Sequence, residues 1–206
     1  MNQVIGHRQD IPLTQDHLQI KRLENDSAVI KQWEAYVAAA PDATFFHRAG
    51  WQTILRTVFG HRTFFLYAER AGVIQGVLPL AQIKSRLFGN SLIALPFAVY
   101  GGVVANSAEV AAALENEAEI LAKALDVAHL EYRNMQPRHP EWPTQDLYVT
   151  FRKEITADDE ANMLAIPRKQ RAMVRKGINN KLRAEFDTTV DRFFALFADN
   201  VHRHGT

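Results

Sequence analysis

Cysteine is absent from the 206 residues, and this absence removes several kinds of site at once. Without a thiol there is no disulfide framework, no zinc or iron–sulfur site with cysteine ligands, and no cysteine nucleophile. The first residues also lack a continuous apolar run, because Met1–Thr14 mixes His7, Arg8 and Asp10 with scattered apolar side chains. A secretory signal needs such a run, so we expect a cytoplasmic location.

A membrane-spanning segment is not expected either. The 22 residues of Leu87–Ala108 carry no charge, and that length raises the question of a transmembrane helix. However, Pro96, Gly101 and Gly102 divide the stretch into short apolar runs. Short apolar runs between turn residues are typical of buried strands, so we expect strands separated by turns here.

Acidic residues are missing from one region of a chain whose charge is otherwise balanced. The composition, with 47% hydrophobic and 23% charged residues, is typical of a soluble globular protein. Residues 1–150 carry 13 basic and 15 acidic side chains, a net charge of −2, and residues 151–206 carry 11 and 8, a net charge of +3. Between Ala161 and Ala184 there are seven Lys or Arg and no carboxylate, which makes this stretch a candidate for ligand binding.

Apolar periodicity and capping residues predict an α/β order of elements up to a proline-rich loop at Pro137–Pro143. The expected elements are a strand at 18–23, a helix from the Asp26 cap to Pro41, a helix at 51–58, a hairpin of strands at 63–69 and 73–84, a strand at 91–95, a helix capped by Ser107 and a strand at 127–133. Beyond the loop the order partly repeats, with strands at 147–152 and 182–186, a helical turn capped by Asp158, a basic helix from Pro167 and an amphipathic last helix. We therefore expect a first domain at 1–145 and the beginning of a second, truncated one at 146–206.

Five sequence segments together resemble the FemAB-like proteins of the GNAT acyltransferase superfamily, most closely the branch associated with PEP-CTERM/exosortase gene sets. They are Phe46–Trp51, Gly76–Leu80, Leu95–Gly102, Leu130–Arg133 and Ile166–Gly177. The resemblance implies two tandem GNAT-like domains, each a mixed, mostly antiparallel sheet flanked by helices, in the α/β (α+β) class. It also implies transfer of an acyl or aminoacyl group to an amine of a cell-envelope or exopolysaccharide precursor.

The sequence departs from the patterns of these families in two ways, one of which bears on the acyl donor and the other on activity. The sequence lacks the Arg/Gln-x-x-Gly-x-Gly/Ala loop with which GNAT enzymes usually cradle the pyrophosphate of acetyl-CoA. Peptidoglycan members of the FemAB group take aminoacyl-tRNA, so the donor is expected to be either aminoacyl-tRNA or acyl-CoA, with no certain resident cofactor. FemAB-like chains also continue well past this length and build part of the acceptor site there, so we expect little activity from these 206 residues alone.

Five cations share one arc of the basic helix, close to its N-terminus: Arg168, Lys169, Arg171, Arg175 and Lys176. Arg grips phosphate through paired hydrogen bonds, whereas Lys acts as a mobile point charge. A phosphate-bearing partner is therefore expected, such as a nucleotide-linked sugar, a lipid-linked glycan precursor or tRNA. A solvated helix face and non-specific contact with RNA remain the alternatives.

Four further residues are candidate substrate contacts. His47 stands at the head of the second helix, where a purely structural role is the alternative. Tyr100 offers a hydroxyl group, although a core or rim tyrosine also fits. Gly101 and Gly102 either let a substrate approach the backbone or supply a turn with positive φ. No metal site and no general base are assigned, and Glu131 and Arg133, on one strand face, fit either an acid–base group or a cross-strand ion pair.

Three functions stay open from the sequence: a FemAB-like transferase, a non-catalytic binding module for a phosphorylated glycan or RNA, and a CoA-dependent N-acyltransferase. The aromatic residues Phe193, Phe194 and Phe197 lie on the last helix, where we expect later strands to cover them. In this chain they are expected to form an exposed apolar surface through which a homodimer can form.

Overall fold

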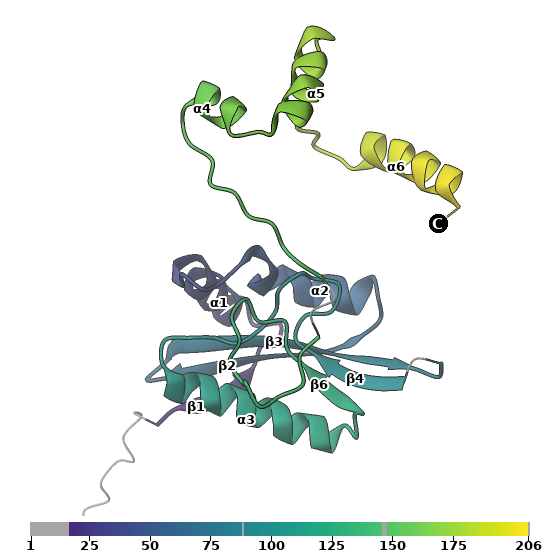
Figure 1. Cartoon of the computed structure of the whole chain (residues 1–206). Helices are drawn as coiled ribbons and strands as arrows, with labels where there is room; N and C mark the ends of the chain where they lie inside the picture. The colour runs from purple at the N-terminus through teal and green to yellow at the C-terminus, as the bar shows by residue number, and fades with distance from the viewer. Residues whose placement is uncertain (1–16, 88, 146–147, 206) are drawn as a thin grey trace, which may run out of the picture. The chain divides into compact units, whose positions relative to one another are not determined.

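The computed structural model describes residues 17–87, 89–145 and 148–205, so the predicted absence of a signal segment at Met1–Thr14 lies outside the described residues. The chain divides into two compact units between Pro143 and Thr144 (Figure 1). The division lies at the end of the proline-rich loop at Pro137–Pro143, and the predicted pair of GNAT-like domains stays a prediction.

The first unit contains a six-stranded sheet. Its path runs β1-β2-β3-β4-β6, with β5 paired to β3 outside the path. Every pairing is antiparallel except the parallel pair of β4 and β6. The strands are β1 (Gln19–Arg22), β2 (Arg62–Arg70), β3 (Val73–Ser85), β4 (Gly89–Ile93), β5 (Val104–Ala105) and β6 (His129–Glu131). A mixed, mostly antiparallel sheet flanked by helices confirms the predicted fold class.

Helices cover both faces of this sheet (Figure 1). One face carries α1 (Ser27–Ala39), the 3-10 turn η1 (Phe45–His47) and α2 (Gly50–Thr57), and the other carries α3 (Ala108–Ala124). The predicted caps are confirmed: the Asp26 carboxylate accepts the Ala28 N–H at 2.8 Å, and the Ser107 hydroxyl accepts the Val110 N–H at 3.3 Å. Such caps satisfy backbone donors that have no partner within the helix.

The core is accordingly split into two layers. Under α1 and α2, Trp33 is fully buried, stacks on Phe65 with ring centroids 5.6 Å apart, and donates its indole N–H to the His47 carbonyl oxygen at 2.8 Å. Under α3, Leu78 and Leu114 are fully buried. Because both faces of the sheet are covered, β2 and β3 contain continuous apolar runs rather than an alternating pattern.

The strand beside β3 is interrupted at its middle. β4 pairs with Ala81–Ser85 of β3 and β5 pairs with Gly76 and Val77, so residues 78–80 have no strand partner on that side. Pro79 lies in this gap, where its missing N–H costs no ladder hydrogen bond. In the described part of the uncharged stretch, two short strands flank the excursion between them, so the prediction of strands separated by turns is confirmed there.

The described part of the second unit contains three helices: α4 (Asp159–Leu164), α5 (Arg168–Asn179) and α6 (Asp191–His204). The strands predicted at 147–152 and 182–186 are wrong for the described residues, since 148–152 and 182–186 form neither helix nor strand, while Leu147 lies outside the described residues. A single β-like segment needs neighbouring strands to satisfy its backbone, and the described part of this unit contains none.

The last helix carries the apolar surface expected of it. Phe193, Phe194 and Phe197 are exposed to 63%, 62% and 49%. Dimerisation through this surface stays a prediction. Within the described ranges, no helix combines the length and apolar character needed to cross a membrane.

Candidate functional site

The excursion between β4 and β5 is the candidate functional site, and we call residues 94–103 the insertion loop. One end of the loop is tied to the last residue of β6 and the other end to a residue just after β6. The Ala94 N–H donates to the Glu131 carbonyl oxygen at 2.8 Å, and Gly101 and Arg133 exchange two backbone hydrogen bonds of 3.0 and 3.3 Å. The chain therefore leaves the sheet after Ala94 and returns at Gly101, beside nearly the same point of the partner segment.

The two glycines of the loop allow close approach of protein groups. A Cβ atom on Gly101 would lie 2.4 Å from the Ala94 carbonyl oxygen, and one on Gly102 would lie 1.9 Å from Asn134 Oδ1. Neither glycine has a positive φ, so the predicted alternative of a positive-φ turn is wrong. The close neighbours are the chain's own groups, and approach of a substrate to these glycines stays a prediction.

Two other residues of the loop hold a backbone conformation that L-residues disfavour. Leu95 has φ of 59° and is fully buried, whereas Phe97 has φ of 65° and is 56% exposed. Conformations of this kind cost roughly 1–3 kcal/mol each, and they are concentrated at functional sites. Burial of Leu95 anchors the loop in the core, and the turn that follows brings Phe97 to the surface.

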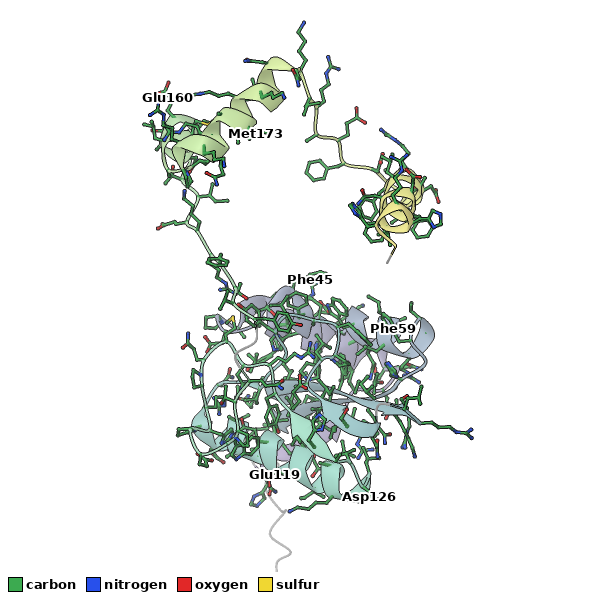
Figure 2. All side chains as sticks on the ribbon, turned by 45° about the vertical axis from the view of Figure 1, so that its right-hand side comes forward. Phe45, Phe59, Glu119, Asp126, Glu160 and Met173 are labelled. Carbon is green, nitrogen blue, oxygen red and sulfur yellow. The ribbon has the colours of Figure 1, made fainter. Side chains whose placement is uncertain are left out.

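Phe97 takes part in an aromatic surface with residues from the α2–β2 connection. Its ring stacks on Phe59 with centroids 4.3 Å apart, and the ring of His61 lies nearly parallel to it at 5.8 Å. Figure 2 shows Phe59 on the same side of the sheet as Phe45 and opposite Glu119 of α3. No sequence pattern predicts this group of three rings, because it depends on the backbone turns at Gly60 and Phe97, both of which have positive φ.

His47 is buried and ties η1 to the insertion loop. Its Nδ1 accepts the Thr44 N–H at 3.1 Å, so in the neutral ring Nε2 carries the proton and donates to the Gly102 carbonyl oxygen at 3.2 Å. Burial lowers the pKa of His47, and the hydrogen bonds to Gly102 and Thr44 oppose that shift only in part. Both ring nitrogens therefore bind protein groups, and contact between His47 and a substrate stays a prediction.

An ion pair between Arg133 and Glu131 holds the insertion loop in place. Arg133 donates to Glu131 Oε1 at 2.8 Å through Nε and to the Ala98 carbonyl oxygen at 2.7 Å through Nη1. The two charged residues pair with each other along one segment rather than across strands, so the expected cross-strand pair is wrong. Their effect is to fix the loop at Ala98, while the half-buried Tyr100 belongs to the same loop.

The predicted basic residues lie on α5 of the second unit, and they differ in their surroundings. Arg168, Lys169, Arg175 and Lys176 are exposed. Arg171 is half-buried and donates to the carbonyl oxygens of Leu164 and Ile166 at 3.2 and 3.1 Å. Arg171 therefore closes the C-terminal end of α4, a structural contact that the helical arc alone does not predict.

Metal-ligating side chains do not gather in the part of the chain that the structure describes: it contains no group of three or more His, Asp or Glu able to hold a metal ion. The site is instead built from backbone groups, aromatic rings and one buried imidazole.

Comparisons with known proteins give no sequence match, because no family model and no curated protein matches the chain. Among solved structures, the chain is similar to a GNAT family acetyltransferase from Staphylococcus aureus, with a TM-score of 0.45, 13% identity, and 67% of this chain and 98% of that chain covered. It is also similar to an aminoglycoside 6'-N-acetyltransferase from Acinetobacter haemolyticus, with a TM-score of 0.44, 16% identity, and 67% of this chain and 99% of that chain covered. For a ribosomal-protein-alanine N-acetyltransferase from Brucella melitensis the TM-score is 0.42 and the identity 12%, with 68% of this chain and 100% of that chain covered. The fold class of this chain rests on its own strand order and register.

Proposed function

We propose that the chain is an acyl- or aminoacyltransferase whose acceptor is an amine of a cell-envelope or exopolysaccharide precursor. The proposal depends on one observation: β4 and β5 pair with β3 on either side of Pro79, and the strained insertion loop fills the interval between them, beside the parallel pair of β4 and β6. The resemblance of the sequence to FemAB-like proteins supports the choice of reaction.

The insertion loop offers backbone donors for an acyl carbonyl. None of the hydrogen bonds found among residues 17–87, 89–145 and 148–205 is donated by the N–H groups of Phe97, Ala98 or Val99. When an amine attacks an acyl carbon, negative charge develops on the carbonyl oxygen, and fixed backbone N–H groups stabilise that charge. Because the loop is tied at Ala94, Gly101 and Ala98, these donors need little reorganisation during the reaction.

The proposed reaction needs no covalent enzyme intermediate. The amine nitrogen bonds to the acyl carbon, and the carbon–sulfur bond of acyl-CoA or the ester bond of aminoacyl-tRNA breaks. The proton lost by the amine goes to the leaving thiolate or to the leaving ribose oxygen, which becomes a hydroxyl group. Holding donor and amine together supplies much of the acceleration. In this scheme Tyr100 contacts the substrate through its hydroxyl group, and His47 positions the loop through the Gly102 carbonyl oxygen.

The exposed cations of α5 are proposed to bind the phosphate groups of the precursor or donor. Arg175 and Lys169 are exposed and free of the α4 contacts that occupy Arg171. Bidentate contacts between guanidinium and phosphate are among the stronger hydrogen bonds in proteins. The same observation favours a second candidate function, a non-catalytic binding module for a phosphorylated glycan or RNA.

Titration with acetyl-CoA, aminoacyl-tRNA and a nucleotide sugar, followed by mass analysis of an amine acceptor, tests the two functions. The transferase predicts saturable binding of one acyl donor and an acceptor heavier by the acyl group. Binding of phosphorylated ligands through α5 with no affinity for either donor supports the binding module instead. Lys169→Gln together with Arg175→Gln weakens phosphate binding in both cases, with Lys31→Gln at an exposed position of α1 as the control.

A further inference from the structure

A groove lies at the sheet edge where β1 ends and β2 begins. β1 pairs only with Leu66–Glu69 of β2, and the last backbone contact is donation from the Leu23 N–H to the Phe65 carbonyl oxygen at 2.7 Å. Residues 62–64 of β2 therefore have no strand beside them on this edge. The groove left there has a volume of about 360 Å³, which lies within the range of small-ligand sites.

Three arginines from three different elements line the groove. Arg22 ends β1, Arg56 lies in the last turn of α2, and Arg62 begins β2. All three side chains are exposed, and none of them belongs to an ion pair found among the described residues. Glu24 is the single carboxylate in the lining of the groove, so positive charge predominates there.

Two of these guanidinium groups are held beside one aromatic ring. Arg22 Cζ lies 5.2 Å and Arg62 Cζ lies 5.3 Å from the ring centroid of the buried Phe64. Contact with the ring face favours both positions, whereas like charges repel each other. A ligand with more than one negative charge removes this repulsion, and phosphate oxygens match the planar fork of arginine.

An aromatic surface adjoins the cations through His61. His61 lines the groove, and its ring lies nearly parallel to those of Phe59 and Phe97, with centroids 6.2 and 5.8 Å away. Phe59 and Phe97 are exposed to 43% and 56%. Exposed ring faces bind planar groups such as nucleobases by stacking.

We propose that this arginine groove (Arg22, Arg56 and Arg62) binds the phosphate groups of a nucleoside diphosphate, whose base stacks on the aromatic surface of Phe59, His61 and Phe97. The proposal rests on charge, groove and ring geometry within the first unit. It shares the ring of Phe97 with the insertion loop, but it uses neither the N–H groups of that loop nor the cations on α5.

Calorimetric titration of the full chain with ADP and with inorganic pyrophosphate at low ionic strength tests the proposal. Both probes are expected to bind saturably, and ADP is expected to bind more tightly because only ADP carries a nucleobase that can stack on the aromatic surface. The triple variant Arg22→Gln, Arg56→Gln, Arg62→Gln is expected to bind both probes at least about tenfold more weakly, since hydrogen bonds to charged groups are lost. Higher salt is expected to weaken both affinities in the wild-type chain.

Two control variants separate the groove from general charge effects. Arg86→Gln removes an exposed arginine and Lys31→Gln removes an exposed lysine, and both residues lie outside the groove. Both are expected to keep the wild-type affinity for ADP, and thermal unfolding checks that each variant is folded. Failure of the wild-type chain to bind either probe, or equal losses in a control and in the triple variant, overturns the proposal.

The aromatic part has its own readout. Phe97→Leu removes the ring while keeping a side chain of similar hydrophobicity, so it is expected to weaken binding of ADP and leave binding of pyrophosphate unchanged. Equal affinities of the wild-type chain for ADP and pyrophosphate, or an unchanged ADP affinity in this variant, overturn the assignment of the ring surface.

Discussion

Replacing Gly101 by alanine tests whether closure of the insertion loop depends on the absence of a side chain. The new Cβ would lie 2.4 Å from the Ala94 carbonyl oxygen and 2.6 Å from Leu95 Cβ. One of these neighbours is backbone and the other is attached directly to it, so neither can rotate away. The Ala94–Gly101 approach must therefore open, which breaks the two backbone hydrogen bonds that Gly101 makes with Arg133.

The expected cost follows from these contacts. Two backbone hydrogen bonds contribute about 1 kcal/mol each, and overpacking adds roughly 1–3 kcal/mol, so Gly101→Ala should lower the free energy of unfolding by about 3–5 kcal/mol. Denaturant unfolding followed by fluorescence measures this change. Gly50→Ala is the matched control, because nothing lies within 4 Å of its new Cβ and the residue begins α2. If both variants are as stable as the wild-type chain, the described closure of the loop is wrong.

Three further changes test separate contacts. His47→Gln keeps a donor and an acceptor but removes the titratable group. Because burial lowers the pKa of His47, the unfolded chain takes up a proton first, and the stability of the wild-type chain should fall as the pH drops below about 6.5. The variant should show a flatter profile of Tm against pH. Glu115→Gln neutralises a buried carboxylate 2.9 Å from the partly exposed Arg138, so we expect a loss of about 1–2 kcal/mol in denaturant unfolding, and an unchanged midpoint would contradict the pairing. Arg171→Gln should speed hydrogen exchange at the end of α4 whereas Arg175→Gln should not, and equal exchange in the two variants would refute the capping contact.

Much of the first unit could be predicted because its local signals agree with its packing. Asp26 and Ser107 are capping residues placed directly before apolar helical patterns, and both accept the expected N–H groups. A proline within an apolar strand is typical of an edge or a bulge, and the structure places Pro79 opposite the interruption between β4 and β5. In each case a single residue type carries the information, since it changes which backbone groups need a partner.

The details of the site could not be predicted, because they depend on contacts between distant residues. Positive φ at Leu95 and Phe97 leaves no mark in the sequence, yet it decides which ring reaches the surface. The two bonds of His47, to Thr44 and Gly102, likewise appear only after η1 and the insertion loop come together.

In the second unit, local patterns gave the wrong answer for strands. Residues 182–186 alternate as a strand does, but an isolated segment has no partner for its backbone groups. Helices α4 and α5 were predictable because they satisfy their hydrogen bonds within themselves, from the Asp158 cap in the first case and from Pro167 in the second.

Hydrogen exchange of the full chain with and without an acyl donor tests the central claim most directly. If the insertion loop holds the acyl group, adding acetyl-CoA or aminoacyl-tRNA should slow exchange in peptides covering residues 94–103, where the N–H groups of Phe97, Ala98 and Val99 have no partner among the described hydrogen bonds. Unchanged exchange in those peptides at saturating concentrations of both donors would contradict the claim that this loop is the site of acyl transfer.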